Sequence, residues 1–129
     1  RRRFYGYHAR GAPDGIDDGT LSPWAMVGSL PFAPEIVLPS LAAVDAAHPE
    51  VKHDYGYTGS FNPSFSAGAA DAVADPPGWT SPAHYPINQG PVVLMIENYR
   101  SGFVWRLTRQ CPYIVAGLRR AGFRGGWLA

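Results

Sequence analysis

The densest run of apolar positions in the chain is Val-Val-Leu-Met-Ile at residues 92–96. One and a half helical turns there carry an apolar side chain on every face, which predicts an interior helix surrounded by other protein. Gly90 and Pro91 come directly before the run, and proline is favoured in the first turn, so we expect the helix to begin there. Glu97 and Arg100 lie further along at a spacing where two side chains meet. A buried ion pair is favoured for them over binding of a ligand, because an unpaired charge is costly inside a protein.

The rest of the chain contains further apolar segments separated by turn-forming residues. Ser22 and Pro23 can cap and open a short helix, and Pro34 can open the next one. Gly102 and Gly122 are stop signals for the later helices. Because no strand signal accompanies these segments, the sequence predicts an all-α architecture. Besides the helix after Gly90, the expected helices cover residues 24–30, 34–47, 103–110 and 112–121.

Two stretches lack a helical period. Residues 1–20 are rich in glycine, aromatic and polar residues, and residues 48–89 mix turn formers with aromatic rings. Loops of the second length are uncommon in compact domains unless they are functional. Within it, residues 67–74 could form one or two helical turns. Flat rings among turn formers can stack on sugar faces, but each ring can equally be a satellite core that holds the loop. The rings considered as stacking platforms are Trp24, Tyr55, Phe61 and Trp79.

The net charge of +1 gives no reason to expect a nucleic-acid partner. Arginines are nevertheless concentrated after Glu97, where no acidic residue follows, and three of them open the chain. A basic surface for nucleic acid is one interpretation of this distribution. The favoured interpretation places these arginines near helix C-termini, where the helix dipole attracts positive charge, and on a solvated face.

Residues with metal or cofactor chemistry are few. Cys111 is the only cysteine, which excludes an internal disulfide, and we expect a packed residue rather than a nucleophile. The three histidines between residues 48 and 84 match no zinc spacing, and no nucleotide-binding motif or serine-hydrolase elbow is present, so no metal and no cofactor is expected. A calcium site near Asp71 and Asp75 is an open alternative. No run approaches the ~18 apolar residues of a membrane span.

Several separate motifs resemble one known family. Asn88-Gln89-Gly90-Pro91, followed by Met-Ile-Glu-Asn-Tyr-Arg-Ser-Gly at residues 95–102, resembles the C-terminal signature of the bacterial putative glucoamylase family. That family includes endo-β-1,2-glucanases and is related to the transglycosylase region of cyclic β-1,2-glucan synthase. The match is weak only in the middle, between about residues 48 and 86. The preceding block of the family resembles residues 11–13, 17–20 and 29–35, in the same order.

The resemblance implies a fold that this chain cannot complete alone. A chain of 129 residues is long enough for one domain, but the (α/α)6 toroid that the resemblance implies needs roughly three times as many. We therefore expect residues 1–129 to be the C-terminal portion of such a toroid, with long irregular loops and no internal domain boundary. The remainder of the parent polypeptide would then be the partner that covers the apolar helices. A periplasmic or secreted location also goes with the resemblance.

The resemblance further implies a glycoside hydrolase or transglycosylase that acts on an oligo- or polysaccharide, a β-glucan and in particular a β-1,2-linked one. Glycosidases usually employ two carboxyl groups. Asp17 and Asp18 are the catalytic candidates, unless they only complement the dipole of the helix that follows. Glu35 is favoured as a first-turn carboxylate. The general acid is expected upstream of Arg1.

Asn88 occupies a position where family members often have Asp, and an amide cannot act as a base. A non-catalytic carbohydrate-binding or structural helical domain is therefore the alternative function. The expected substrate contacts are Asn88, Gln89, Trp24, Tyr55, Phe61, Trp79, Glu97 and Arg100.

Overall fold

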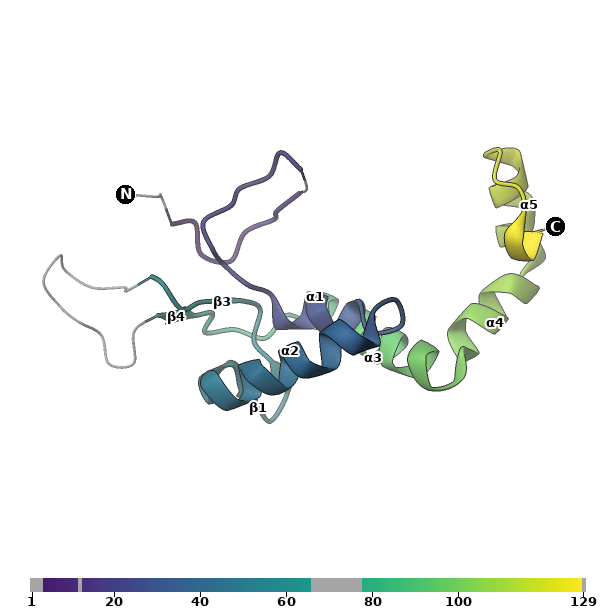
Figure 1. Ribbon diagram of the computed structural model, residues 1–129. Helices are drawn as coiled ribbons and strands as arrows, with labels where there is room; N and C mark the ends of the chain where they lie inside the picture. The colour runs from purple at the N-terminus through teal and green to yellow at the C-terminus, as the bar shows by residue number, and fades with distance from the viewer. Residues whose placement is uncertain (1–3, 12, 66–77, 129) are drawn as a thin grey trace, which may run out of the picture.

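The computed structural model describes residues 4–11, 13–65 and 78–128. Five α-helices dominate this part of the chain, and four short strands lie between the second and the third (Figure 1). The helix predicted at residues 67–74 and the carboxylates Asp71 and Asp75 lie outside the described residues. The helices are α1 (Pro23–Gly28), α2 (Pro34–Ala47), α3 (Pro86–Ser101), α4 (Phe103–Gln110) and α5 (Pro112–Arg120), with 3-10 turns η1 (Pro49–Val51) and η2 (Gly126–Leu128).

Proline opens four of the five helices in the described ranges, at Pro23, Pro34, Pro86 and Pro112. Its fixed φ suits the first helical position, where the missing N–H would have had no intrahelical partner. The predicted bounds of α2 and α4 are confirmed, and α1 and α5 end within two residues of the prediction. Ser22 occupies the N-cap position of α1, but its side chain makes no capping hydrogen bond.

The start of α3 was predicted wrongly. The helix begins at Pro86 rather than near Gly90, because Tyr85 is extended before a proline that can occupy the first position. Pro91 therefore lies inside α3, and only the Ile87 carbonyl near the N-terminus loses a donor. As a consequence, the Asn88-Gln89 pair is part of the first turns of α3 rather than of the loop before it.

The described part of the chain is mostly helical, as predicted, but it also contains short strands that the sequence did not indicate. Two antiparallel hairpins form in the long middle segment, β1 (Lys52–His53) with β2 (Gly56–Tyr57), and β3 (Phe61–Asn62) with β4 (Trp79–Thr80). Each strand has two residues, which is too short for alternation of polar and apolar positions to be visible in the sequence. An isolated bridge between Leu21 and Phe61 ties the second hairpin to the chain before α1.

The buried core lies where α1 packs against α2 and α3 and where the middle segment closes over them (Figure 1). Phe61 is 1% exposed, and full burial of such a side chain contributes about 2–3 kcal/mol. The other buried apolar residues are Val27, Leu30, Val37 and Val51.

The apolar run of α3 is not surrounded by the described part of this chain. Val93 is 65% exposed, and Leu94 and Ile96 are exposed as well. On α2, Ile36 and Leu38 also face outward. Exposed apolar surface of this extent is typical of faces that other protein covers.

The two C-terminal helices extend away from the packed body (Figure 1). Gly102 adopts a left-handed conformation with φ of 65° and separates α3 from α4, which confirms the predicted break. Arginines occupy the last turns of α3, α4 and α5, as expected from the helix dipole. Among the helices of the described ranges, none is long and apolar enough to cross a membrane.

Candidate functional site

Asn88 occupies the junction between the first turn of α3 and the N-terminal loop. Its side chain is buried, with 4% of the residue exposed. The Tyr7 hydroxyl donates to Asn88 Oδ1 at 3.3 Å, so the N-terminal loop contacts the first turn of α3 here. The Nδ2 atom of Asn88 is buried and donates to no acceptor in the described ranges. An unpaired buried donor is costly, which is typical of a polar site that a ligand or water completes.

Gln89 turns toward the first hairpin. Its Nε2 atom donates to the Tyr57 carbonyl at 3.1 Å, which fixes β2 against the N-terminal end of α3. Its Oε1 atom lies close to Gly56, where a Cβ would come within 3.3 Å of it. Gly56 has a φ of 90°, so glycine is favoured there for backbone geometry as well. Gln89 therefore holds the hairpin in place and leaves an amide oxygen beside it.

Two tyrosines that the sequence did not single out form one wall of this region. The rings of Tyr7 and Tyr85 stack with a centroid separation of 3.8 Å and an angle of 6°. Both rings press on Gly59, where a Cβ would lie 2.7 Å from Tyr85 and 2.9 Å from Tyr7. The Gly59 carbonyl in turn accepts a hydrogen bond from Trp24 Nε1 at 3.1 Å. Trp24 is half-buried, and its polar edge is engaged by the protein.

The neighbouring carboxylates Asp17 and Asp18 differ sharply in environment. Asp18 is buried, and its oxygens accept hydrogen bonds from the backbone of Tyr5 at 3.0 Å and of Thr20 at 3.1 Å. The Arg10 guanidinium pairs with it at 3.2 Å. Burial raises the pKa of Asp18, but the hydrogen bonds from Thr20 and Tyr5 and the Arg10 charge outweigh burial and leave the pKa lowered. Asp18 thus organises the N-terminal loop.

Asp17, in contrast, is exposed. One of its oxygens accepts the Gly19 N–H at 3.3 Å, and the side chain is otherwise open to solvent. Both carboxylates precede α1 in the chain, and the first turn of α1 itself contains no acidic residue. The adjacent residues therefore have separate roles, Asp18 in holding the loop and Asp17 at its surface.

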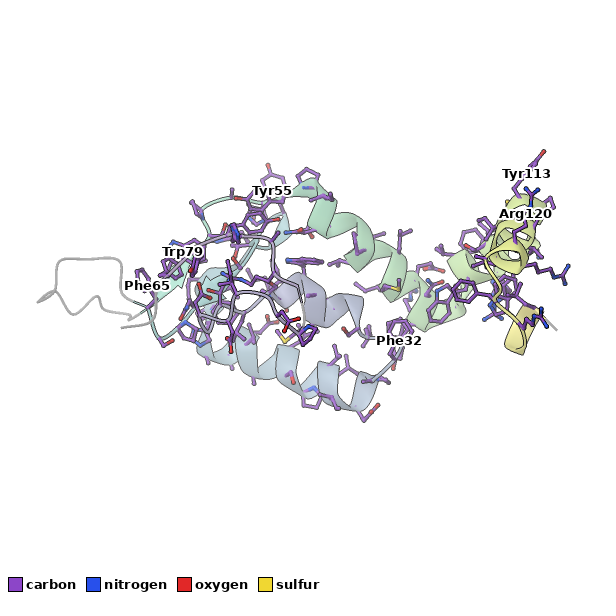
Figure 2. The ribbon with its side chains drawn as sticks, turned by 90° about the horizontal axis from the view of Figure 1, so that it is seen from above. Phe32, Tyr55, Phe65, Trp79, Tyr113 and Arg120 are labelled. Atoms are coloured by element: carbon purple, nitrogen blue, oxygen red, sulfur yellow. The ribbon has the colours of Figure 1, made fainter. Side chains whose placement is uncertain are left out.

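The aromatic residues proposed as sugar platforms are not equally accessible. Phe61 is a core residue and offers no ring face to a ligand, so its prediction as a platform is corrected in favour of the core interpretation. Tyr55 is 80% exposed. Trp79 is half-buried and meets Phe4 edge to face at 4.9 Å, while Phe4 stacks on Phe65 at 3.7 Å. Figure 2 shows Tyr55, Trp79 and Phe65 on the side of the molecule opposite α5.

Glu97 and Arg100 do not form the predicted ion pair. The Glu97 carboxylate accepts a hydrogen bond from the Ser101 hydroxyl, and Arg100 is exposed with no carboxylate partner in the described ranges. Glu97 lies nine residues after Asn88 on the same helix, about 13 Å along its axis. The structure therefore does not bring these two side chains together with Asn88 and Gln89.

The histidines lie near the same hairpins. His53 and His84 meet edge to face at 5.6 Å, and His84 Nδ1 is buried with no partner in the described ranges. His48 pairs with Glu50 at 3.2 Å. Within residues 4–11, 13–65 and 78–128, no group of three or more His, Cys, Asp or Glu side chains is arranged to hold a metal ion.

The sequence profile of the family described as "Putative glucoamylase" matches residues 1–112. An exo β-1,2-glucooligosaccharide sophorohydrolase (non-reducing end) of Parabacteroides distasonis is 27% identical over 117 residues, which is 90% of this chain and 15% of that protein.

Solved structures of related proteins also resemble this chain. A putative glucoamylase of Bacteroides uniformis superposes with a TM-score of 0.69 and 30% identity, over 93% of this chain and 28% of its own. The endo-β-1,2-glucanase of Chitinophaga pinensis, in complex with sophorotriose and glucose, superposes with a TM-score of 0.65 and 31% identity, over 94% and 26%. The chain thus spans 15% of the curated relative and about a quarter of these solved chains.

Proposed function

Because the chain belongs to the putative glucoamylase family, we propose that it is the C-terminal portion of an (α/α)6 toroid that hydrolyses or transglycosylates a β-glucan. Two of the relatives named above, the sophorohydrolase and the endo-β-1,2-glucanase, are named for action on β-1,2-linked glucose units, which makes β-1,2-glucan the proposed substrate. The observation that carries the proposal is the buried Asn88 amide, whose free donor lies where two loops and a helix N-terminus converge.

In this proposal the first turns of α3 and the surrounding loops form part of the cleft wall. Asn88 and Gln89 supply hydrogen-bonding groups for sugar hydroxyls, since each retains an amide atom without a protein partner in the described ranges. Tyr55, Trp79 and Trp24 supply ring faces. The exposed apolar faces of α2 and α3 are the surfaces that the other helices of the toroid cover.

The proposed chemistry needs two carboxyl groups, one that protonates the leaving oxygen and one that acts as base or nucleophile. Asp17 is the better base candidate of the two adjacent carboxylates, because it is exposed while Asp18 has both oxygens occupied. Asp18 positions the loop that carries Asp17. The general acid is proposed to lie upstream of Arg1, and Asn88 binds substrate rather than acting as base.

The test uses the polypeptide that contains this chain and linear β-1,2-glucan as substrate. We expect Asp17→Asn to abolish release of reducing ends while retaining glucan binding, and Asn88→Ala to weaken binding. Asp14→Asn is the matched control, because Asp14 is an exposed carboxylate of the same loop. Full activity of both Asp17→Asn and Asp18→Asn would refute the assignment of the catalytic carboxylate to this loop.

A non-catalytic carbohydrate-binding or structural domain is the alternative, and the Asn88 amide favours it. If Asp occupied this position and accepted a proton, substitution by Asn would remove the base. Asn88→Asp separates the two functions. If the parent releases no reducing ends and Asn88→Asp does, the natural protein is a binding domain that has lost its base. If the parent itself releases reducing ends, it is an enzyme.

A further inference from the structure

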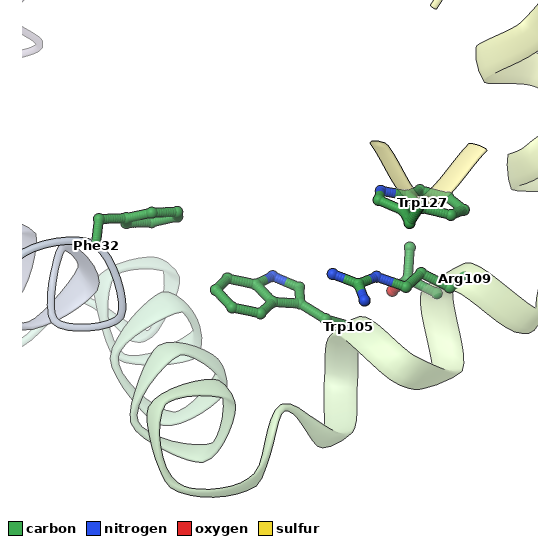
Figure 3. A pocket seen from close by; sticks show the side chains of 5 residues that line it. Phe32, Trp105, Arg109 and Trp127 are labelled. Carbon is green, nitrogen blue, oxygen red and sulfur yellow. The ribbon is translucent and has the colours of Figure 1, made fainter. Parts of the chain in front are cut away.

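A cavity lies where the loop after α1 faces α4 and η2, beyond the end of α3 opposite Asn88 (Figure 3). Its volume is about 320 Å³, which is in the range of small-ligand sites. It is lined by Phe32, Trp105, Thr108, Arg109 and Trp127.

Aromatic rings form the apolar walls of this cavity. Phe32 and Trp105 lie 5.8 Å apart between ring centroids with an angle of 49°, and Trp127 faces them from η2 (Figure 3). Phe32 is 71% exposed and Trp127 is 42% exposed. A hollow lined by several large rings is typical of a binding site.

Arg109 supplies the polar part of the cavity. Its guanidinium lies 5.7 Å from the centre of the Trp127 ring, a cation–π distance, and Figure 3 shows it directed into the space between the two indoles. It has no carboxylate partner and no hydrogen-bond acceptor within the described ranges. The Thr108 hydroxyl donates to the Val104 carbonyl, so the free side-chain donors among these lining residues are the Arg109 guanidinium and the indole N–H groups of Trp105 and Trp127.

The cavity is separate from the Asn88 region. Asn88 is in the first turn of α3, and Trp105 lies in the helix that follows the other end of α3. Residues 86–101 of α3 span about 22 Å at 1.5 Å per residue. No side chain is shared between the two places.

We propose that this cavity is a second binding site for a β-glucan chain, distinct from the cleft at Asn88. A pyranose ring has apolar C–H faces and a rim of hydroxyl groups. The cavity offers a partner for each part. The rings of Phe32, Trp105 and Trp127 can pack against the C–H faces, and the Arg109 donors can bind the hydroxyl groups. Its single charge is already stacked on an indole, which favours a neutral polyhydroxyl ligand over an acidic peptide.

The inference rests on the proposed function, since the ligand is the saccharide assigned to the cleft. Its consequence is a length effect. A polymer that occupies both sites gains an effective-concentration advantage, whereas a trisaccharide in the cleft gains nothing from the second site. The cavity therefore increases affinity for long glucan without changing the turnover of short oligosaccharides.

The experiment compares Trp127→Ala and Arg109→Gln with the parent, again in the polypeptide that contains this chain. We expect each to weaken binding of long linear β-1,2-glucan about fivefold to tenfold, as loss of one aromatic or charged contact would. Turnover of a β-1,2-linked trisaccharide should be unchanged. Tyr113→Ala is the matched control, because Tyr113 is an 86% exposed ring on α5 outside the cavity.

A Trp127→Phe variant keeps a ring face and should restore most of the polymer affinity, which separates ring contact from a folding defect. Polymer affinity equal to that of the parent in both Trp127→Ala and Arg109→Gln, with the Asn88→Ala variant still impaired, would overturn this inference and leave the proposed function intact. Absence of glucan binding by the parent itself would overturn both. A Glu-rich peptide that binds the parent but not Arg109→Gln, with polymer binding unaffected, would identify an acidic protein partner instead.

Discussion

The Tyr57 hydroxyl donates a hydrogen bond to the Asp45 carboxylate at 2.7 Å, which joins the C-terminal half of α2 to the first hairpin. Lys52 Nζ lies 2.6 Å from the other carboxylate oxygen and 5.4 Å from the centre of the Tyr57 ring. Burial, together with the bond to Asp45, raises the pKa of Tyr57 to about 12. The hydrogen bonds from Lys52 and Tyr57 lower the pKa of Asp45. These three side chains fix the β1–β2 hairpin against α2, and Gln89 fixes the same hairpin against α3.

The raised pKa of Tyr57 predicts a loss of stability in alkaline solution. Because the folded-state value of about 12 exceeds the reference value of 10.0, its contribution is complete below pH 10 and is lost as the pH rises toward 12. Tyr57→Phe should remove this portion of the pH dependence and lower the free energy of unfolding at pH 7 by about 1 kcal/mol. Urea unfolding of parent, Tyr57→Phe and the exposed control Tyr113→Phe across this range measures it. An unchanged alkaline slope in Tyr57→Phe would contradict the assignment.

Asp18 should show the opposite pH dependence. Its folded-state pKa is lowered, so its contribution is present above the unfolded value of 3.8 and is lost as the pH falls through the lower folded value. Asp18→Asn also leaves the Arg10 guanidinium without its partner, and we expect faster proteolysis within residues 4–20 at neutral pH. Asp14→Asn should be cleaved at the parental rate. Equal cleavage of both variants would show that the Arg10–Asp18 pair does not order the loop.

How far the sequence predicts the fold depends on the range of the signals. Pro34 is a local helix start signal and Gly102 a local stop signal, and the helix bounds they imply are confirmed. Pro86 and Pro91 can both start a helix and are five residues apart, so local signals alone do not choose between them. The helix begins at Pro86, after an extended Tyr85. The strands at Phe61 and Trp79 were missed because their pairing is long-range, and two residues carry no periodicity.

The candidate site was predictable in part for the same reason. The motif at Asn88 and Gln89 marks the end of α3 that meets the loops, but it contains no information on which loop residues arrive there. Tyr7 and Tyr85 are 78 residues apart and meet only in the folded chain. Glu97 and Arg100 have helix spacing suited to a pair, yet the Ser101 hydroxyl, four residues after Glu97, donates to the carboxylate instead. Helical spacing permits a contact without selecting it.

Asn98 is predicted to control the joint between α3 and α4. Gly102, the residue before α4, has no side chain to cap the helix, and Asn98 Oδ1 accepts the Trp105 N–H at 3.0 Å instead. Asn98→Ala should cost about 1–2 kcal/mol in the free energy of unfolding, because the Trp105 N–H in the first turn of α4 loses its acceptor. Asn98→Asp keeps the acceptor and should cost less. Equal losses for Ala and Asp, measured by chemical denaturation, would exclude capping as the role of Asn98.

The last prediction concerns Gly59, where backbone and ring faces approach closely. A Cβ at this position would lie 2.7 Å from the Tyr85 ring and 2.9 Å from the Tyr7 ring, closer than carbon atoms approach in proteins. Gly59→Ala must therefore part the Tyr7–Tyr85 stack or shift the Trp24 hydrogen bond, at a cost of about 1–3 kcal/mol.

The matched control for Gly59→Ala is Gly117→Ala on α5. Nothing lies within 4 Å of a Cβ built there, so the substitution should be neutral or stabilise the helix by up to about 1 kcal/mol. Because Tyr7 donates to Asn88, Gly59→Ala should also weaken binding of β-1,2-glucan at the cleft while Gly117→Ala leaves it unchanged. Thermal unfolding and glucan binding of both variants test the two effects separately. Parental glucan affinity in a destabilised Gly59→Ala variant would show that the tyrosine stack supports the fold but does not position Asn88.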